Sequence, residues 1–254
     1  MAGLEPPPPL RGLSPPRGEE KNASLPPQGE VPPKGGKGAG DRARIWDIPT
    51  RLVHLLLAVL IPFSWWAAKS DHLPWHRLSG YTILGLLVFR VIWGFVGSPT
   101  ARFSTFMRGP AGVIAYLRGG AWAGVGHNPL GGWSIMAMLA VLATQVGLGL
   151  FSIDEDSLEP GPLSHFVSFD TGRAIAHLHH RLFWGLVGLI ALHLAAIAVY
   201  ALRGRDLVRP MITGSAPAGE GTPAPPHAPL WRAVPAALAA AAVAWFVAHG
   251  LKRV

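Results

Sequence analysis

Five apolar runs, each close to the length that a bilayer requires, constrain this chain more than any other feature. A backbone surrounded by lipid must satisfy its own hydrogen bonds, and runs of this length do so as helices. Charged residues make up 14% of the chain, below the roughly 25% usual in soluble domains. The sequence therefore predicts an all-α integral membrane protein. The runs cover residues 52–68, 75–96, 132–153, 174–202 and 231–251.

The segments around these runs differ in composition. Residues 1–44 are rich in Pro, Gly, Lys and Arg and lack the apolar stretch of a signal peptide, so we expect a disordered tail. Residues 45–214 form the predicted transmembrane domain, 215–229 a linker, and 230–254 an additional C-terminal transmembrane helix. The Gly-rich segment between the second and third runs is too polar to span, and one short interfacial helix is expected in it at 112–117.

The net charge of +8 does not indicate a nucleic-acid partner, because Lys and Arg flank the apolar runs instead of forming one basic face. The positive-inside rule places the N-terminal tail and the loops after the second and fourth runs in the cytoplasm. Lys252 and Arg253 then lie outside, so the fifth helix is either an exception to the rule or does not cross fully. The residues that set this orientation are Arg42, Arg44, Arg51, Arg102, Arg108, Arg118, Arg203, Arg205, Arg209 and Arg232.

Histidine is the main ligand type, because the chain has no cysteine, which excludes disulfides, thiolate chemistry, iron–sulfur clusters and CxxCH haem attachment. The fourth run, AHLHHRLFWGLVGLIALHL, contains four histidines. Helical geometry places His179 and His193 within about 40° of each other in rotation and about 21 Å apart along the axis. His177 and His180 point elsewhere, so the predicted ligands of this helix are His179 and His193.

Two more histidines lie at matching depths on other helices. His54 is near the cytoplasmic end of the first run and pairs with His193, and His76, at the opposite end of the second, pairs with His179. Zinc or copper would require three or four ligands that converge on one point, whereas two separate pairs suit two stacked haems. Because both axial positions of each iron are then filled, the predicted role is electron transfer.

Arg90 follows His76 by about four helical turns and is level with the inner histidine pair. Two readings remain open: the guanidinium binds a haem propionate, or it reaches the cytoplasmic interface along its own stem. Gly80 and Gly94 have the same spacing and could let a flat ring approach the helix.

Several further polar residues have a structural interpretation that we favour. For His127 this is a cap or loop hydrogen bond, ahead of a quinone or propionate contact. Thr144 and Gln145 are expected to bond a neighbouring helix. His180 is expected to face lipid headgroups, ahead of a haem-edge or quinone contact. The acidic loop around His165 could dock a basic c-type cytochrome, but ordinary solvated charge is the favoured interpretation.

Four segments resemble the bacterial di-haem cytochrome b561 family, which is related to the cytochrome b subunits of nickel–iron hydrogenases. They are WDIPTRLVHLLLA, WHRLSGYTILGLLVFRVIWGFVGS, GHNPLGGWSIMAMLA and LHHRLFWGLVGLIALHLAA, within residues 45–214. The resemblance implies a four-helix bundle in the bacterial cytoplasmic (inner) membrane that binds two non-covalent b haems. The family motif often has Glu where this chain has His180, and the haem ligand of that motif is the preceding histidine. The resemblance therefore implies that His179 is the ligand.

Three functions follow from this reading. The first is electron transfer across the membrane between the quinone pool and a partner redox protein, such as a c-type cytochrome at the extracytoplasmic face. The second is a quinone-linked oxidoreductase that acts directly on a small reductant such as superoxide. A non-redox metal transporter with a histidine-bearing scaffold ranks below both.

Overall fold

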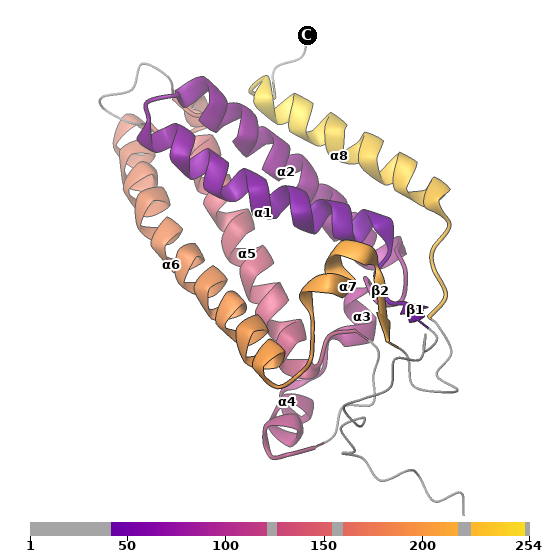
Figure 1. Ribbon diagram of the computed structural model, residues 1–254. Coiled ribbons are helices and arrows are strands. Elements are labelled where there is room, and N and C mark those ends of the chain that lie inside the picture. The colour runs from indigo at the N-terminus through magenta and orange to yellow at the C-terminus, as the bar shows by residue number, and fades with distance from the viewer. Residues whose placement is uncertain (1–41, 121–125, 154–159, 218–224, 252–254) are drawn as a thin grey trace, which may run out of the picture. The chain divides into compact units, whose positions relative to one another are not determined.

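Five helices in the described part of the chain are long and apolar enough to cross a membrane, which confirms the predicted fold class. The computed structural model describes residues 42–120, 126–153, 160–217 and 225–251, so most of the predicted tail and the acidic residues 154–159 lie outside it (Figure 1). The five helices are α1 (Ile48–Lys69), α2 (Leu73–Val96), α5 (Pro129–Phe151), α6 (Phe169–Leu202) and the segment Leu230–Ala248, which contains η2 (Leu230–Arg232) and α8 (Ala233–Ala248).

The helices begin before the apolar runs that predicted them, because capping residues extend them at their N-termini. Asp47 caps α1 by accepting a hydrogen bond from the backbone N–H of Thr50. Asn128 caps α5 in the same way, through the N–H of Gly131 at 2.7 Å. Ser168 caps α6. Polar residues outside an apolar run thus decide where these helices start.

Shorter elements connect the long helices: α3 (Phe103–Phe106), α4 (Pro110–Leu117) and α7 (Val208–Thr213) lie at one end of the bundle, and η1 (Ser164–Phe166) lies between α5 and α6 at the other. The expected interfacial helix is α4, and the sequence did not predict α3, η1 or α7. Two short strands, β1 (Arg42–Arg44) and β2 (Ser215–Pro217), pair antiparallel with Ala43 opposite Ala216. We call the end that carries these strands the ribbon end, and α1 begins and α6 terminates beside it (Figure 1).

Helix α2 lies at the centre of the packing. It packs against α1, α5 and α8, while α5 pairs with α6 (Figure 1). One buried cluster joins α1, α2 and α8, and a second joins α2, α5 and α6. The first contains Val53, Phe89, Trp93, Ala101, Ala236 and Ala240, and the second Ile83, Leu87, Leu142 and Leu186.

Glycines allow three close approaches to this core. A Cβ at Gly85 would lie 3.5 Å from the Cβ of Ala244, so α8 runs close along α2. The ring of Phe103 fills the space that a side chain at Gly94 would need, and Phe106 lies 3.0 Å from the Cβ position of Gly132. Helix α3 is therefore wedged between α2 and α5 at the ribbon end.

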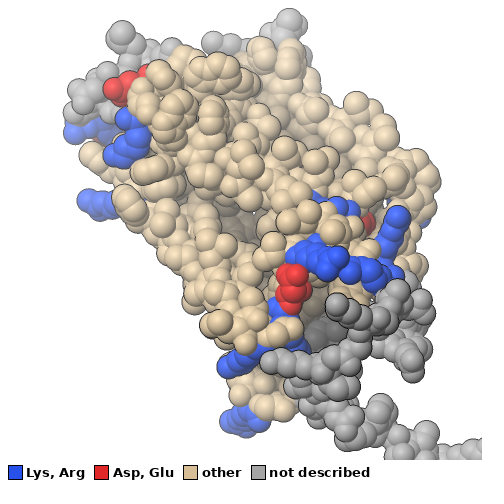
Figure 2. Space-filling model, in the orientation of Figure 1, with Lys and Arg blue, Asp and Glu red and all other residues tan. Residues whose placement is uncertain are grey.

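Charged side chains gather at the two ends of the described surface. Figure 2 shows Lys and Arg around α7 and near α4 at the ribbon end, and a mixed group of basic and acidic side chains at the opposite end, with a largely uncharged surface between them. At the ribbon end, Arg51 donates hydrogen bonds to the carbonyls of Met211 and Ile212, and Arg42 donates to Ser215. An uncharged belt between two charged ends is typical of a membrane protein.

Asp47 links the cap of α1 to the core, and its replacement tests that link. Its carboxylate also accepts from the indole N–H of Trp93 at 2.9 Å. Burial alone raises the pKa of Asp47, but the hydrogen bonds that it accepts outweigh this and hold the pKa below its usual value of 3.8. Its stabilising contribution is therefore complete above that value and is lost as the pH falls through the lower pKa of the folded state.

We expect Asp47→Ala to lower the free energy of unfolding by about 2–4 kcal/mol, because it removes a helix cap and leaves a buried indole donor without a partner. Thermal unfolding in detergent at pH 7 measures this. Asp206→Ala is the matched control, since the exposed Asp206 accepts hydrogen bonds from the N–H groups of Val208 and Arg209 at the start of α7, and its loss should cost about 1 kcal/mol or less. Equal effects of the two substitutions would contradict the link to the core.

Candidate functional site

Two pairs of histidine rings face each other across the bundle. The ring centroids of His54 on α1 and His193 on α6 lie 6.4 Å apart, and those of His76 on α2 and His179 on α6 lie 6.2 Å apart. Helix α6 continues without interruption through both positions, so its two histidines are separated by about 21 Å along the axis. The structure thus brings together the same two pairs that helical phase and depth predicted.

The pair farther from the ribbon end is held by hydrogen bonds at the Nδ1 atoms. Nδ1 of His76 lies 2.9 Å from the carbonyl oxygen of Ser64, and Nδ1 of His179 lies 2.9 Å from that of Gln145. A carbonyl oxygen can only accept, so in each ring Nδ1 carries the proton and donates it. In the neutral rings the Nε2 lone pairs remain available to bind a metal ion.

Arg90 stands beside the pair nearer the ribbon end. Its side chain is 7% exposed, and its guanidinium carbon lies 4.9 Å from the ring centroid of Phe103. The Nη1 atom is buried and has no hydrogen-bond partner in the described chain. Of the two readings that the sequence left open, burial favours a guanidinium that holds an anion over one that extends to the membrane surface.

His127 does not have the role that we favoured for it. Asn128 caps α5, whereas Nδ1 of His127 is buried and lacks a partner within the described residues. Burial, together with the charges of Arg90, His193 and His54, lowers the pKa of His127 to about 3, so the ring is neutral at physiological pH. The expectation of a cap or loop hydrogen bond at Nδ1 is therefore wrong.

The geometry of the pairs fits haem iron. A metal–imidazole bond of about 2.0 Å on each side of one ion places the two ring centroids about 6.3 Å apart, close to both observed distances. Among the described residues, no three His, Cys, Asp or Glu side chains gather to hold a metal ion. The backbone beside Gly80 is open, whereas the ring of Phe103 occupies the space beside Gly94. Of the two glycines singled out, Gly80 alone leaves room for a flat cofactor.

The remaining histidines of α6 and the outer loop lie apart from the two pairs. His177 and His180 are exposed on α6, although the ring of His180 is 6.1 Å from that of His179. His165 lies in η1 and contacts Phe166, and the acidic residues that accompany it in the sequence are outside the described part. None of these three is brought to a pair.

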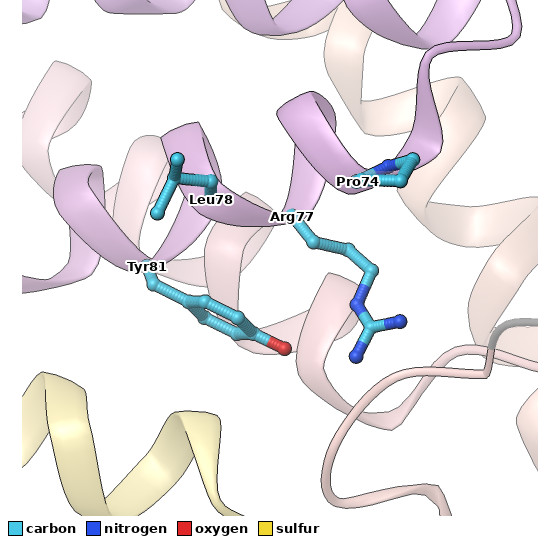
Figure 3. A pocket seen from close by; sticks show the side chains of 4 residues that line it. All are labelled: Pro74, Arg77, Leu78 and Tyr81. Carbon is cyan, nitrogen blue, oxygen red and sulfur yellow. The ribbon is translucent and has the colours of Figure 1, made fainter.

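A shallow pocket of about 270 Å³ lies on another face of α2 (Figure 3). Its lining residues are Pro74, Arg77, Leu78 and Tyr81. Figure 3 shows the hydroxyl of Tyr81 and the guanidinium of Arg77 directed toward the same space. Helical phase turns this face away from His76, so the pocket is separate from the paired histidines.

Sequence reasoning missed two residues that position the outer pair, Ser64 and Gly149, whereas Gln145 bonds the neighbouring helix α6 as expected. The carbonyl of Ser64 accepts from His76, and the carbonyl of Gln145 accepts from His179. The side-chain amide of Gln145 also lies 3.3 Å from Nε2 of His179. Gly149 leaves room for His179, since a Cβ there would be 3.1 Å from its Cε1. The signal that could have identified them is a polar residue or glycine that lies at the same membrane depth as a histidine of the neighbouring helix.

Comparison with known protein families shows which class of protein this chain belongs to. The family model described as "Prokaryotic cytochrome b561" matches residues 45–214, a region that contains all four paired histidines. Membership implies a membrane b-type cytochrome, a class that binds haem b. The chain belongs to the prokaryotic cytochrome b561 family, as its sequence motifs predicted. No curated protein and no solved structure was found to match it.

We expect Gly149→Val to displace the ring of His179 and to reduce the haem b bound per chain, because the added methyl groups would occupy the position of that ring. Gly147→Val is the matched control, because Gly147 lies on the same helix, α5, and a Cβ there would have no atom within 4 Å. Pyridine haemochrome absorbance per mole of purified protein measures the effect. Equal haem content in the two variants would contradict the prediction.

Proposed function

We propose that this protein is a di-haem cytochrome b that carries electrons across the membrane between the quinone pool and a redox partner at the opposite face. His54 and His193 hold one haem b, and His76 and His179 hold the other. The observation that carries the proposal is the spacing of the ring centroids, 6.4 and 6.2 Å, which matches two imidazoles on one iron. Haem iron, once bound, supplies one-electron chemistry between its ferric and ferrous states.

The residues around each pair define what the protein contributes. The Ser64 and Gln145 carbonyls orient the outer imidazoles and increase their basicity as ligands. Arg90, with its buried and unpartnered Nη1, supplies a donor for a propionate of the inner haem. If each pair holds its haem through two imidazoles, neither iron would keep an open position for oxygen or a substrate. This favours electron transfer over catalysis at the iron.

A layer of apolar side chains separates the two pairs. Ile83 lies between His76 and Arg90 along α2, and Leu186 lies about midway between His179 and His193 along α6. Both are buried in one cluster with Leu87 and Leu142. None of these four side chains can relay a proton. The layer would therefore hinder ions from passing between two haems held by the histidine pairs.

The distribution of charge supports an orientation. We place the ribbon end, with Arg42, Arg51 and the basic loops after α2 and α6, in the cytoplasm of a bacterial cell. Helix α8 then runs outward, and Lys252 and Arg253, which follow it in the sequence, are an exception to the positive-inside rule. The partner protein, a c-type cytochrome or similar carrier, docks at the opposite end.

We expect the purified protein to bind two b haems, and His193→Ala and His179→Ala to bind one each, because each substitution removes an axial ligand from a different iron. His180→Ala is the matched control and should retain both, since His180 is exposed beside His179. Haem per chain from pyridine haemochrome spectra measures this. A His193→Ala variant that retains both haems would show that the pairing is wrong.

We expect a short-chain quinol to reduce both haems of the protein reconstituted in liposomes, and an oxidised soluble carrier on one side only to reoxidise them. Stopped-flow absorbance of the haem α bands follows both steps. Superoxide is the comparison reductant: rapid reduction by superoxide with no response to quinol would support the small-reductant oxidoreductase instead. Metal-dependent transport by a protein without haem absorption would support the transporter.

A further inference from the structure

Among the described residues, three buried side-chain atoms at the ribbon end have no hydrogen-bond partner: Oγ1 of Thr50, Nη1 of Arg90 and Nδ1 of His127. A buried donor without a partner costs on the order of 1–3 kcal/mol, more when it is charged, and native proteins rarely retain one that has no purpose. Two of these atoms, Nη1 of Arg90 and Nδ1 of His127, lie close to one histidine pair and indicate a ligand that receives both.

The two side chains belong to the same wall of aromatic rings. The guanidinium of Arg90 lies over Phe103, whose ring centroid is 5.9 Å from that of Phe106. The Phe106 centroid is 5.2 Å from that of His127, and Trp46 covers His127 at 4.6 Å. Since α3 supplies both phenylalanines, the wedge between α2 and α5 places Arg90 and His127 against one cluster of aromatic rings.

The inner histidine pair lies near both side chains. His54, His193 and Arg90 are all near enough to His127 to act on it electrostatically. His54 lies six residues after the start of α1, and Arg90 lies six residues before the end of α2. At 1.5 Å per residue, both therefore lie about 9 Å inside the ribbon end. His127 directly precedes the α5 cap and lies farther out. An elongated group bound by the pair and extending toward the ribbon end therefore meets Arg90 and then His127.

The donor set defines the chemistry of that group. The cation of Arg90 excludes a positively charged ligand, and a neutral imidazole donates one hydrogen bond from Nδ1 when Nε2 is unprotonated. A guanidinium and an N–H donor together suit a carboxylate. We propose that Arg90 and His127 together bind the carboxylates that project from the inner haem, with His127 as a second cofactor-binding residue beside Arg90; this rests on the proposed function.

This role has a consequence for the haem potential. A neutral N–H that donates a hydrogen bond to a haem carboxylate offsets part of the negative field of that carboxylate at the iron, which favours the ferrous state. We therefore expect His127→Leu to lower the midpoint potential of one haem and leave that of the other unchanged. His127→Asn places an amide donor near the Nδ1 position and should restore most of the shift.

The experiment combines a redox titration of the α bands with infrared difference spectra of protein that contains haem labelled with ¹³C at its carboxylates. We expect His127→Leu to lower one midpoint and to shift the labelled carboxylate bands, and His127→Asn to return both toward wild type. His165→Leu is the control, since His165 lies in η1 far along the chain from the ribbon-end residues, and it should change neither. A His127→Leu protein with two haems, unchanged midpoints and unchanged bands would overturn the inference.

A second measurement uses the wild-type protein alone, in case His127→Leu does not assemble. Solid-state NMR of the reduced protein with ¹⁵N-histidine and ¹³C-carboxylate haem should show magnetisation transfer between a histidine Nδ1 and a haem carboxylate, and His127→Asn should abolish it. Absence of this contact from a protein with two haems overturns the inference and leaves the proposed function standing. Absence of haem from the wild-type protein overturns both.

Discussion

The molecule depends on one geometric constraint, the separation of His179 and His193 by about four turns of a single uninterrupted helix. Because both side chains lie on nearly the same side of α6, each must find its partner ring across the bundle at its own depth. Helices α1 and α2 meet this requirement from opposite ends, since His54 lies near the start of one and His76 near the start of the other. Antiparallel packing of α1 and α2 therefore sets the two depths.

Helix α2 transmits this constraint to the rest of the bundle. It contributes to both buried clusters and carries His76 at one end and Arg90 toward the other. At the ribbon end its Gly94 receives the ring of Phe103, which positions α3 against α5. Helix α2 thus carries both His76 and Arg90, and it also positions α3 beside Arg90. Displacement of α2 would disturb both pairs together.

The sequence predicted what depends on local periodicity and length. Run length identified the five spans, and rotation along a helix selected His179 and His193 over His177 and His180. What it could not predict depends on contacts between distant segments, such as the strand pairing of residues 42–44 with 215–217 and the wedge of α3. His127 shows the limit most clearly. The preference of Asn for the N-cap position and the following Pro129 assign the cap of α5 to Asn128, but the burial of His127 depends on tertiary contacts that the sequence does not reveal.

Helix α8 changes how this bundle can associate with neighbours in the plane of the membrane. Its Ala236, Ala240 and Ala244 run along α2 and the close approach at Gly85. This side of α2, the helix that carries His76 and Arg90, is therefore already covered by α8. A second membrane subunit must approach by the outward surfaces of α1, α5 or α6, or by α8. The extra helix thus acts as a built-in lateral neighbour, which restricts the ways in which two such bundles can be brought close enough to exchange electrons within the bilayer.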